Sequence, residues 1–264
     1  MSLQILVSTM NQKDFHLLER MKIQSDAIII NQCDDEGIFN LDKDGFKIKW
    51  INSKNRGLSR SRNMAIDNAD RTICVLADDD LEYVPNYRDI ILQHFKLYPD
   101  ADVIAFQVEG IEAKFKDYYP KPRKINYLTS MKISSVEIAF RLDKVKAANI
   151  RFNELFGAGA KYCMGEENIF LIECLKKGLN VHYVPKKIAY LHIGESSWFK
   201  GFNDNYFINR GAIFAAMSKR FSVPLIVQFA IRKHKLFKDE MTRIQAIKLM
   251  LEGKRRLLEH DMNA

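Results

Sequence analysis

The chain has 264 residues with 41 Lys and Arg against 33 Asp and Glu, so its formal net charge is +8. Hydrophobic residues make up 47% and charged residues 28%, a mixture that excludes a wholly disordered chain. With 12 Gly and 6 Pro, the chain is also not collagen-like or linker-like. The length predicts one large domain, alone or with a small extension.

Most of the basic excess lies at the C-terminal end. Residues 219–259 contain eleven Lys or Arg and four Asp or Glu, a net charge of 11 − 4 = +7. A protein that bound nucleic acid over its whole body would be basic throughout, so no nucleic acid partner is expected. We predict a near-neutral main domain over residues 1–218 and a basic amphipathic helical extension over 219–264. The extension either binds an anionic membrane surface or packs on protein, and the sequence leaves both open.

The cysteines and apolar runs bear on location. Four cysteines at irregular spacings, with no CxxC pair, do not suggest a disulfide framework or a zinc site. The N-terminus lacks a signal-peptide pattern, and the apolar run 221–231 is shorter than the about 20 residues that span a bilayer. A cytoplasmic location is therefore expected, with peripheral attachment to the inner face of the membrane if the extension binds lipid.

Short apolar runs alternate with helical patterns along the first half of the chain. Strands are expected at residues 3–7, 26–30, 46–51, 72–77 and 103–108, and helices at residues 15–23, 59–68 and 85–97. In the second half, a strand is expected at 136–141, a helix at 166–177, and strands at 181–184 and 188–192. Helical pattern continues from about residue 205. This alternation predicts an α/β sheet with parallel strand pairs.

Three consecutive aspartates, Asp78, Asp79 and Asp80, follow the apolar run Thr72–Ala77 directly. Ligands of open α/β sheets bind beyond the carboxyl ends of the strands. Three carboxylates at such a place repel one another unless a cation lies among them, and Mg²⁺ or Mn²⁺ takes oxygen ligands of this kind. The alternative interpretation is a solvated acidic turn before a helix.

The order of the motifs resembles that of family 2 glycosyltransferases with the GT-A fold, over roughly residues 3 to 210. The pattern consists of a strand ending in Ser8-Thr9, Asn55-x-Gly57 leading to Arg62-Asn63 before a helix, the strand ending in Asp78-Asp79-Asp80, and Gly165-Glu166-Glu167-Asn168. The resemblance implies a Rossmann-like, mixed but mostly parallel sheet flanked by helices, with the helical extension added at the C-terminus. It also implies an inverting hexosyltransferase of the bacterial surface-polysaccharide type.

Site roles follow from the resemblance. Asp78 and Asp80 are expected to bind Mn²⁺ or Mg²⁺, and Asp78 and Asp79 to lie at the nucleotide-sugar. The other residues expected at the nucleotide-sugar are Ser8, Thr9, Asn55, Arg62, Asn63 and Glu166. A planar guanidinium suits oxyanions, so Arg62 is expected to contact a phosphate or the base edge. The family commonly ends its second strand with two acidic residues that read the base. Here that strand ends in Asn31-Gln32, and either these amides replace the carboxylates or the alignment shifts to Asp34-Asp35.

Glu167 is the expected catalytic base, because it stands where the family has an acidic residue at the start of a helix. The alternative is a structural role, in which two glutamates in a first helical turn interact favourably with the helix dipole. His192, after a late strand, is expected to complete the metal site, although a lone histidine there is usually structural. Trp198 is expected to stack on the acceptor sugar, or else to pack on the core.

The predicted reaction is metal-assisted transfer of a sugar from a nucleotide-diphosphate donor, with a UDP-sugar favoured, to a hydroxyl of a glycan or a lipid-linked acceptor. A nucleotidyltransferase of related fold is the enzymatic alternative, but Ser8–Lys13 lacks the glycines of a phosphate-binding loop. A nucleic-acid-binding protein is the third alternative, and it leaves the three aspartates unexplained.

Overall fold

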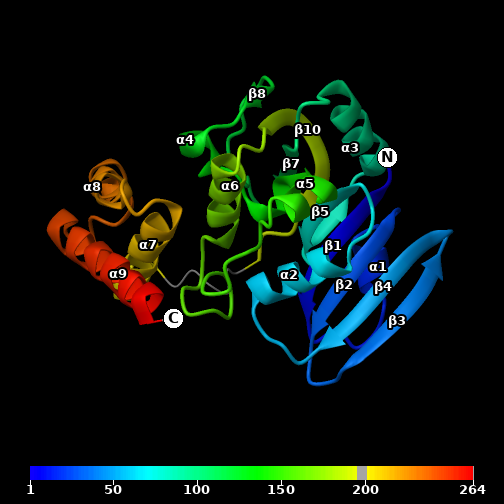
Figure 1. Ribbon diagram of the computed structural model, residues 1–264, viewed down its shortest axis with the longest axis horizontal. Coiled ribbons are helices and arrows are strands. Elements are labelled where there is room, and N and C mark those ends of the chain that lie inside the picture. The colour runs from blue at the N-terminus through cyan, green and yellow to red at the C-terminus, as the bar shows by residue number, and fades with distance from the viewer. Residues whose placement is uncertain (195–200, 264) are drawn as a thin grey trace.

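The computed structural model describes residues 1–194 and 201–263 (Figure 1). A ten-stranded mixed sheet forms its centre, in the order β3-β4-β2-β1-β5-β9-β7-β10-β6, with β8 paired to β10. The strands are β1 (Leu3–Met10), β2 (Asp26–Gln32), β3 (Gly37–Lys43), β4 (Phe46–Ser53), β5 (Ile73–Asp78), β6 (Leu81–Tyr83), β7 (Val103–Gly110), β8 (Arg123–Lys124), β9 (Ile138–Arg141) and β10 (Val181–Leu191). The α-helices are α1 (Leu17–Arg20), α2 (Leu58–Asn68), α3 (Tyr87–Leu97), α4 (Tyr127–Ser130), α5 (Leu142–Ala147), α6 (Glu166–Lys176), α7 (Asp204–Met217), α8 (Ser222–Arg232) and α9 (Arg243–Asn263). Short 3₁₀ turns occupy Ser135–Glu137 and His234–Leu236.

The longest ladders of the sheet centre are parallel. Strand β1 pairs in parallel with β2 and with β5, β2 pairs in parallel with β4, and β7 pairs in parallel with β10. The carboxyl ends of β4, β2, β1 and β5 therefore meet at one edge of the sheet, as expected for an α/β fold. The predicted fold class is confirmed.

Side chains from the two faces of the sheet enter two separate cores. On one face, Ile5 and Val7 of β1 pack with Ile91 and Phe95 of α3. On the other face, alternate residues of β1 and β5 pack with helices α2, α5 and α6. This division follows from the two-residue period of a strand, and it explains why the central strands are apolar on both faces.

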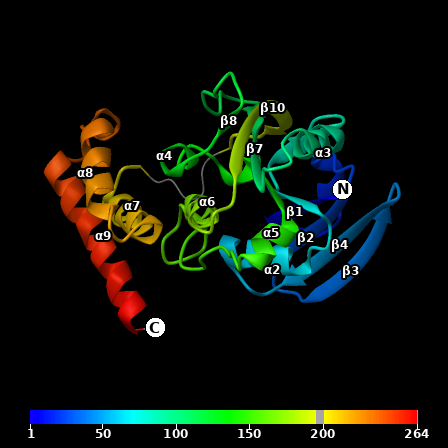
Figure 2. The same ribbon diagram turned by 45° about the horizontal axis from the view of Figure 1, so that its top comes forward.

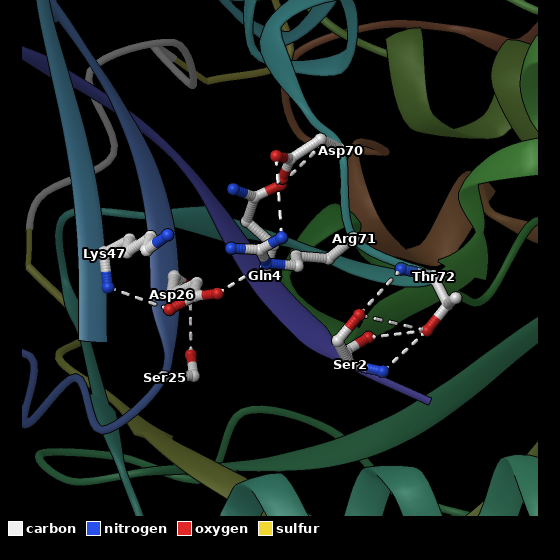
Figure 3. Close-up of polar contacts among 8 residues, drawn as sticks. All are labelled: Ser2, Gln4, Ser25, Asp26, Lys47, Asp70, Arg71 and Thr72. Carbon is white, nitrogen blue, oxygen red and sulfur yellow. Dashed lines mark hydrogen bonds and ion pairs between the residues drawn. The ribbon is translucent and has the colours of Figure 1, made fainter. Parts of the chain in front are cut away.

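Polar contacts join the first residues of four neighbouring strands (Figure 3). Arg71, before β5, donates a hydrogen bond to the Asp26 carboxylate, whose other oxygen accepts a hydrogen bond from the Lys47 backbone amide at 2.8 Å. The Gln4 side-chain oxygen accepts a hydrogen bond from the Asp70 backbone amide at 3.1 Å. These bonds fix the amino ends of β1, β2, β4 and β5, at the edge opposite the predicted site.

The last three helices form a unit beside the sheet (Figures 1 and 2). Helices α7 and α9 cross closely, because Gly211 and Gly253 each face the backbone of the other helix. An added Cβ would lie 1.8 Å from the Met250 carbonyl oxygen at Gly211, and 1.8 Å from the Ile208 carbonyl oxygen at Gly253. The domain boundary expected after residue 218 would therefore separate α7 from α9, the helix on which α7 packs.

Several elements differ from the sequence expectations, including the short elements β6, β8, α4 and α5, which had no predicted counterpart. Strand β3 was not expected; it forms a hairpin with β4 through Asp44 and Gly45, which both have positive φ. The two strands expected at 181–184 and 188–192 form the single strand β10, whose pairing with β7 shifts register between Tyr183 and Lys187. Pro185 lies at this shift, and proline cannot donate a ladder hydrogen bond. Helix α1 covers only part of residues 15–23.

Within the described residues, none of the helices has both the length and the apolar character needed to cross a membrane.

Candidate active site

Polar residues gather where β1 and β5 end. Ser8 stands opposite Asp78 in the parallel ladder of these strands. The Ser61 hydroxyl on α2 donates a hydrogen bond to the Ser8 hydroxyl at 2.8 Å, and the Thr9 hydroxyl donates one to the Asp79 carboxylate. Ser8 and Thr9 therefore lie beside the acidic run, and their hydroxyls are already engaged within the protein.

Arg62 joins two carboxylates that are far apart in the sequence. Its side chain is 1% exposed, and it donates one hydrogen bond to Asp78 at 2.8 Å and another to Glu166 at 2.9 Å. The expected role was a direct contact with a phosphate or base. The structure instead places the guanidinium in the interior, between the strand end that carries the acidic run and the first turn of α6. Arg62 and Glu166 are buried and Asp78 is partly exposed, and burial of the first two charges is compatible with folding because each has a partner.

The loop before α6 docks on the start of α2 through backbone contacts. The Ser59 hydroxyl donates a hydrogen bond to the Phe156 carbonyl at 2.6 Å, and the Leu58 amide donates one to the Ala158 carbonyl at 2.9 Å. Gly157 has a φ of +103°, and a Cβ there would lie 3.3 Å from the Glu166 carboxyl carbon. Glycine at this position therefore leaves room for the carboxylate that Arg62 holds.

Glu166 and Glu167 form the first turn of α6, after the left-handed Gly165. Glu166 is buried, whereas Glu167 is partly exposed. Desolvation and the neighbouring charge of Glu166 raise the pKa of Glu167, while Arg62 opposes this rise. A carboxylate with a raised pKa is a stronger proton acceptor than an ordinary one once it is ionised.

Asp79 and Asp80 differ in their partners. Asp79 accepts hydrogen bonds from Thr9 and from the Gln12 side chain. Asp80 is exposed, yet the surrounding protein removes water from its carboxylate and, together with the charges of Asp78 and Asp79, raises its pKa to about 7. The nearby guanidinium of Arg62 pairs with Asp78 and Glu166 and not with Asp80.

His192 lies beside Asp80 without binding its carboxylate in the structure. The His192 backbone amide donates a hydrogen bond to the Asp80 carbonyl at 3.0 Å, and the ring Nδ1 lies 2.9 Å from a carboxylate oxygen of Glu112. Half of the His192 side chain is exposed. The ring is therefore oriented by Glu112 at the rim of the site.

The two predicted asparagines have different surroundings. Asn63 is buried, donates to the Phe152 carbonyl at 3.0 Å and accepts from the Phe152 amide at 2.9 Å. It thus fixes α2 to the chain that leads to the Gly157 loop. Asn55 lies on an exposed stretch before α2.

The amides at the end of β2 are buried and bonded within the protein. Asn31 bonds to the backbone of Gln12 and to Asn52, and the Gln32 side-chain oxygen accepts from the Gly57 amide at 2.7 Å. These amides hold the strand end and the loop before α2, and both have less than 4% of their surface exposed.

The sequence profile of Glycosyl transferase family 2 matches residues 27–164, slightly more than half of the chain. The chain belongs to this family. It is therefore a glycosyltransferase, and the expected enzyme class is confirmed. Comparison with curated protein sequences gives no match.

Solved structures of Staphylococcus aureus TarS share the fold of this glycosyltransferase. TarS 1–349 in complex with UDP-GlcNAc has 12% identity and a TM-score of 0.68, covering 96% of this chain and 81% of TarS 1–349. The complex with UDP has 12% identity and a TM-score of 0.64, covering 92% and 76%. TarS 1–349 without a named ligand has 11% identity and a TM-score of 0.63, covering 98% and 92%.

Three further side chains hold residues of the candidate site in place. Ser61, Gln12 and Glu112 were not among the predicted site residues, and they hold Ser8, Asp79 and His192 respectively. Ser61 stands within the quoted motif and could have been singled out there, whereas no local pattern marks Gln12 or Glu112. Trp198 lies outside the described residues, as does the rest of 195–200.

The residues at the acidic run fit a divalent cation that is completed by substrate. The described residues contain no group of three His, Cys, Asp or Glu side chains that could hold a metal unaided. Asp78 and Asp80 nevertheless offer oxygen ligands. Desolvation raises the pKa of Asp80, and so do the charges of Asp78 and Asp79, which a divalent cation would offset. Mg²⁺ is commonly bound by one or two carboxylates together with substrate phosphates and water, which matches this pair.

Proposed function

We propose that this glycosyltransferase inverts the anomeric carbon while it moves a sugar from a nucleoside-diphosphate donor to an acceptor hydroxyl. The observation that carries the proposal is the Arg62 link, because it fixes the acidic run at Asp78 and the first turn of α6 in one site. A donor-phosphate site and a candidate base are thereby held together by one buried side chain.

The proposed donor site lies at the carboxyl ends of β1 and β5. Ser8 and Thr9 line it near the nucleoside, Asp78 and Asp80 would hold Mn²⁺ or Mg²⁺, and His192 stands at its rim. When bound, the metal would offset the charge of the leaving diphosphate. A UDP-sugar is the favoured donor, since the TarS structures of the same fold contain UDP-GlcNAc and UDP.

Glu167 is the proposed base. As the acceptor oxygen bonds to the anomeric carbon, the bond from that carbon to the donor phosphate breaks, and the nucleoside diphosphate leaves with the electron pair. The acceptor proton passes to the Glu167 carboxylate. Attack opposite the leaving group inverts the anomeric carbon. Arg62 and Asn63 act as positioning residues, because their side chains are buried and bonded to protein.

The acceptor is proposed to be a glycan or a lipid-linked saccharide, as in surface-polysaccharide synthesis. The family resemblance supports this choice of setting.

The donor proposal is tested by thermal stability in the presence of UDP-sugars and GDP-sugars, with and without Mn²⁺. A UDP-sugar should raise Tm in a Mn²⁺-dependent way, because a ligand that binds only the folded state stabilises it. Asp80→Asn should abolish the metal-dependent part of the shift. If none of the nucleotide-sugars shifts Tm with metal, the proposal is wrong.

The base is tested with Glu167→Gln, which should keep donor binding and lower transfer by about 10²–10⁴-fold, the usual contribution of a general base. Glu173→Gln is the matched control on the same helix, because Glu173 is partly exposed and pairs with Lys176. Normal transfer by Glu167→Gln would assign the base to another residue.

A further inference from the structure

Helix α8 is apolar on the side that faces water. Its inner residues Ile226 and Ala230 are buried in the core of the helical unit. On the outer side, Val223, Val227 and Ile231 follow one another at four-residue intervals, so they form one row along the helix. Ile231 is 56% exposed. A surface helix of a soluble domain usually carries polar residues on its outer side, so an exposed apolar row at this place is unusual.

The apolar row has more large hydrophobic residues around it. Phe221, just before α8, is 58% exposed, and Leu236, just after it, is also exposed. Together with Val223, Val227 and Ile231 these residues make up what we call the α8 patch. Figures 1 and 2 show α8 and α9 at the end of the molecule away from β3 and β4, so the sheet does not cover the patch.

Basic residues lie at both ends of the apolar row. Residues 219–238 contain six Lys or Arg and no Asp or Glu. Arg220 precedes the row, and Arg232, Lys233 and Lys235 follow it; all four are exposed. Asp239 and Glu240 are the nearest acidic residues along the chain, and they come after this segment.

We propose that the α8 patch docks on an anionic lipid surface, with the apolar row in the acyl boundary and the flanking cations at the headgroups. This combination of an apolar helix face and flanking Lys and Arg is what holds interfacial helices on membranes. Each cation near such a surface adds to the attraction. The inference is independent of the donor, the metal and the base.

The positive charge favours lipid over a second copy of the chain. In a two-fold dimer the same patch meets itself, so Arg220, Arg232, Lys233 and Lys235 would approach their own equivalents. Like charges placed opposite one another oppose association, whereas an anionic bilayer neutralises them.

The test is sedimentation of the full chain with vesicles of phosphatidylglycerol and phosphatidylcholine, compared with phosphatidylcholine alone. The wild type should bind the anionic vesicles, bind the neutral ones much more weakly, and lose binding as salt is raised, because salt screens the attraction. Arg232→Gln/Lys233→Gln/Lys235→Gln should weaken binding roughly 100-fold. Val223→Gln/Val227→Gln/Ile231→Gln should weaken it at least about tenfold, through lost apolar insertion.

Two matched triple variants control for general loss of charge or apolar surface. Lys121→Gln/Lys144→Gln/Lys186→Gln removes three exposed cations elsewhere, and Ile38→Gln/Leu97→Gln/Leu128→Gln removes three exposed apolar residues elsewhere. Both controls should bind as the wild type does, and circular dichroism should show a cooperative thermal transition in all four variants, which shows that they fold.

The proposal is wrong if the wild type does not bind anionic vesicles, or if the patch variants bind as well as the controls. It is also wrong if light scattering shows a wild-type dimer that Val223→Gln/Val227→Gln/Ile231→Gln dissociates, because the row would then be a subunit interface.

Discussion

At the scale of single residues, Arg62 determines how the site is put together. Its two hydrogen bonds join Asp78 at the end of β5 to Glu166 on α6, and neither carboxylate has a large exposed surface. The role of Arg62 is therefore to hold the acidic run and the α6 turn at a fixed distance. A planar guanidinium can reach both carboxylates at once, which a lysine cannot do with the same geometry.

Arg62→Met should destabilise the protein by about 3–5 kcal/mol, because it leaves Glu166 buried without its cation. Urea unfolding gives the free energy of unfolding. Arg151→Gln is the control, since Arg151 also pairs with an aspartate, Asp67, but half of each side chain is exposed. We expect that control to cost less than about 1 kcal/mol. Equal losses in the two variants would contradict the buried-link interpretation.

Glu167→Gln should make the protein more stable than the wild type as pH rises. The folded state raises the pKa of Glu167 from its ordinary value of 4.5 to about 8. At a pH between these two values, the folded state therefore binds more protons than the unfolded state. Wild-type stability therefore falls as pH rises through this window, and the amide variant lacks this loss. Urea unfolding at intervals from about pH 5 to about pH 8 measures the difference. A difference that stays constant with pH would show that Glu167 has an ordinary pKa.

At the scale of secondary-structure elements, the start of α6 depends on the loop before it. Gly157 has a left-handed backbone and lies against Glu166, while Phe156 and Ala158 bond to the first turn of α2. Helices α2 and α6 thus meet through this loop as well as through Arg62. The position of the proposed base is set by these contacts and not by α6 alone.

Gly157→Ala should lower transfer by about 10–100-fold, because small displacements of catalytic groups are costly. Gly178→Ala is the control: Gly178 has a φ of +81°, and an added Cβ would meet nothing within 4 Å. Both variants should lose about 1–2 kcal/mol of stability through left-handed backbone strain. Only Gly157→Ala should lose activity beyond that effect, as initial rates at matched folded fractions would show. Equal rates in the two variants would exclude a positioning role for the loop.

At the scale of the whole molecule, the helical unit shares a core with the α/β body. Phe156, Tyr162 and Ile169 of the body pack in one cluster with residues of α7, α8 and α9. We propose that the second folding unit begins with α7 instead of at residue 219. Because this core is shared, the unit and the body should unfold together.

Gly211→Ala should destabilise the whole chain by more than about 2 kcal/mol, because its Cβ would overlap the backbone of α9 at Met250. Replacing glycine by alanine within a helix ordinarily stabilises a protein, so a loss of stability here would indicate the close contact between α7 and α9. Lys248→Ala, on the exposed side of α9, is the control and should be nearly neutral. Circular dichroism and tryptophan fluorescence should report a single transition; two separate transitions would show that the helical unit folds independently.

The sequence by itself determined the features that depend on residues close together along the chain. Apolar runs of about five residues predicted β1, β2, β4, β5 and β7, and the position of the three aspartates after one of them predicted the edge of the sheet where the site lies. The hairpin of β3 and β4 also had a local signal, the Asp44-Gly45 turn, but β3 is largely exposed and its apolar pattern is weak.

Only the tertiary structure decided which charged groups face one another. Arg62 and Glu166 are 104 residues apart, and nothing in either segment indicates that they meet in the interior. The close crossing of α7 and α9 likewise depends on glycines 42 positions apart, at residues 211 and 253. The physical reason is that periodicity and turn residues act over a few neighbours, whereas burial brings together groups from distant segments, and burial then fixes their partners.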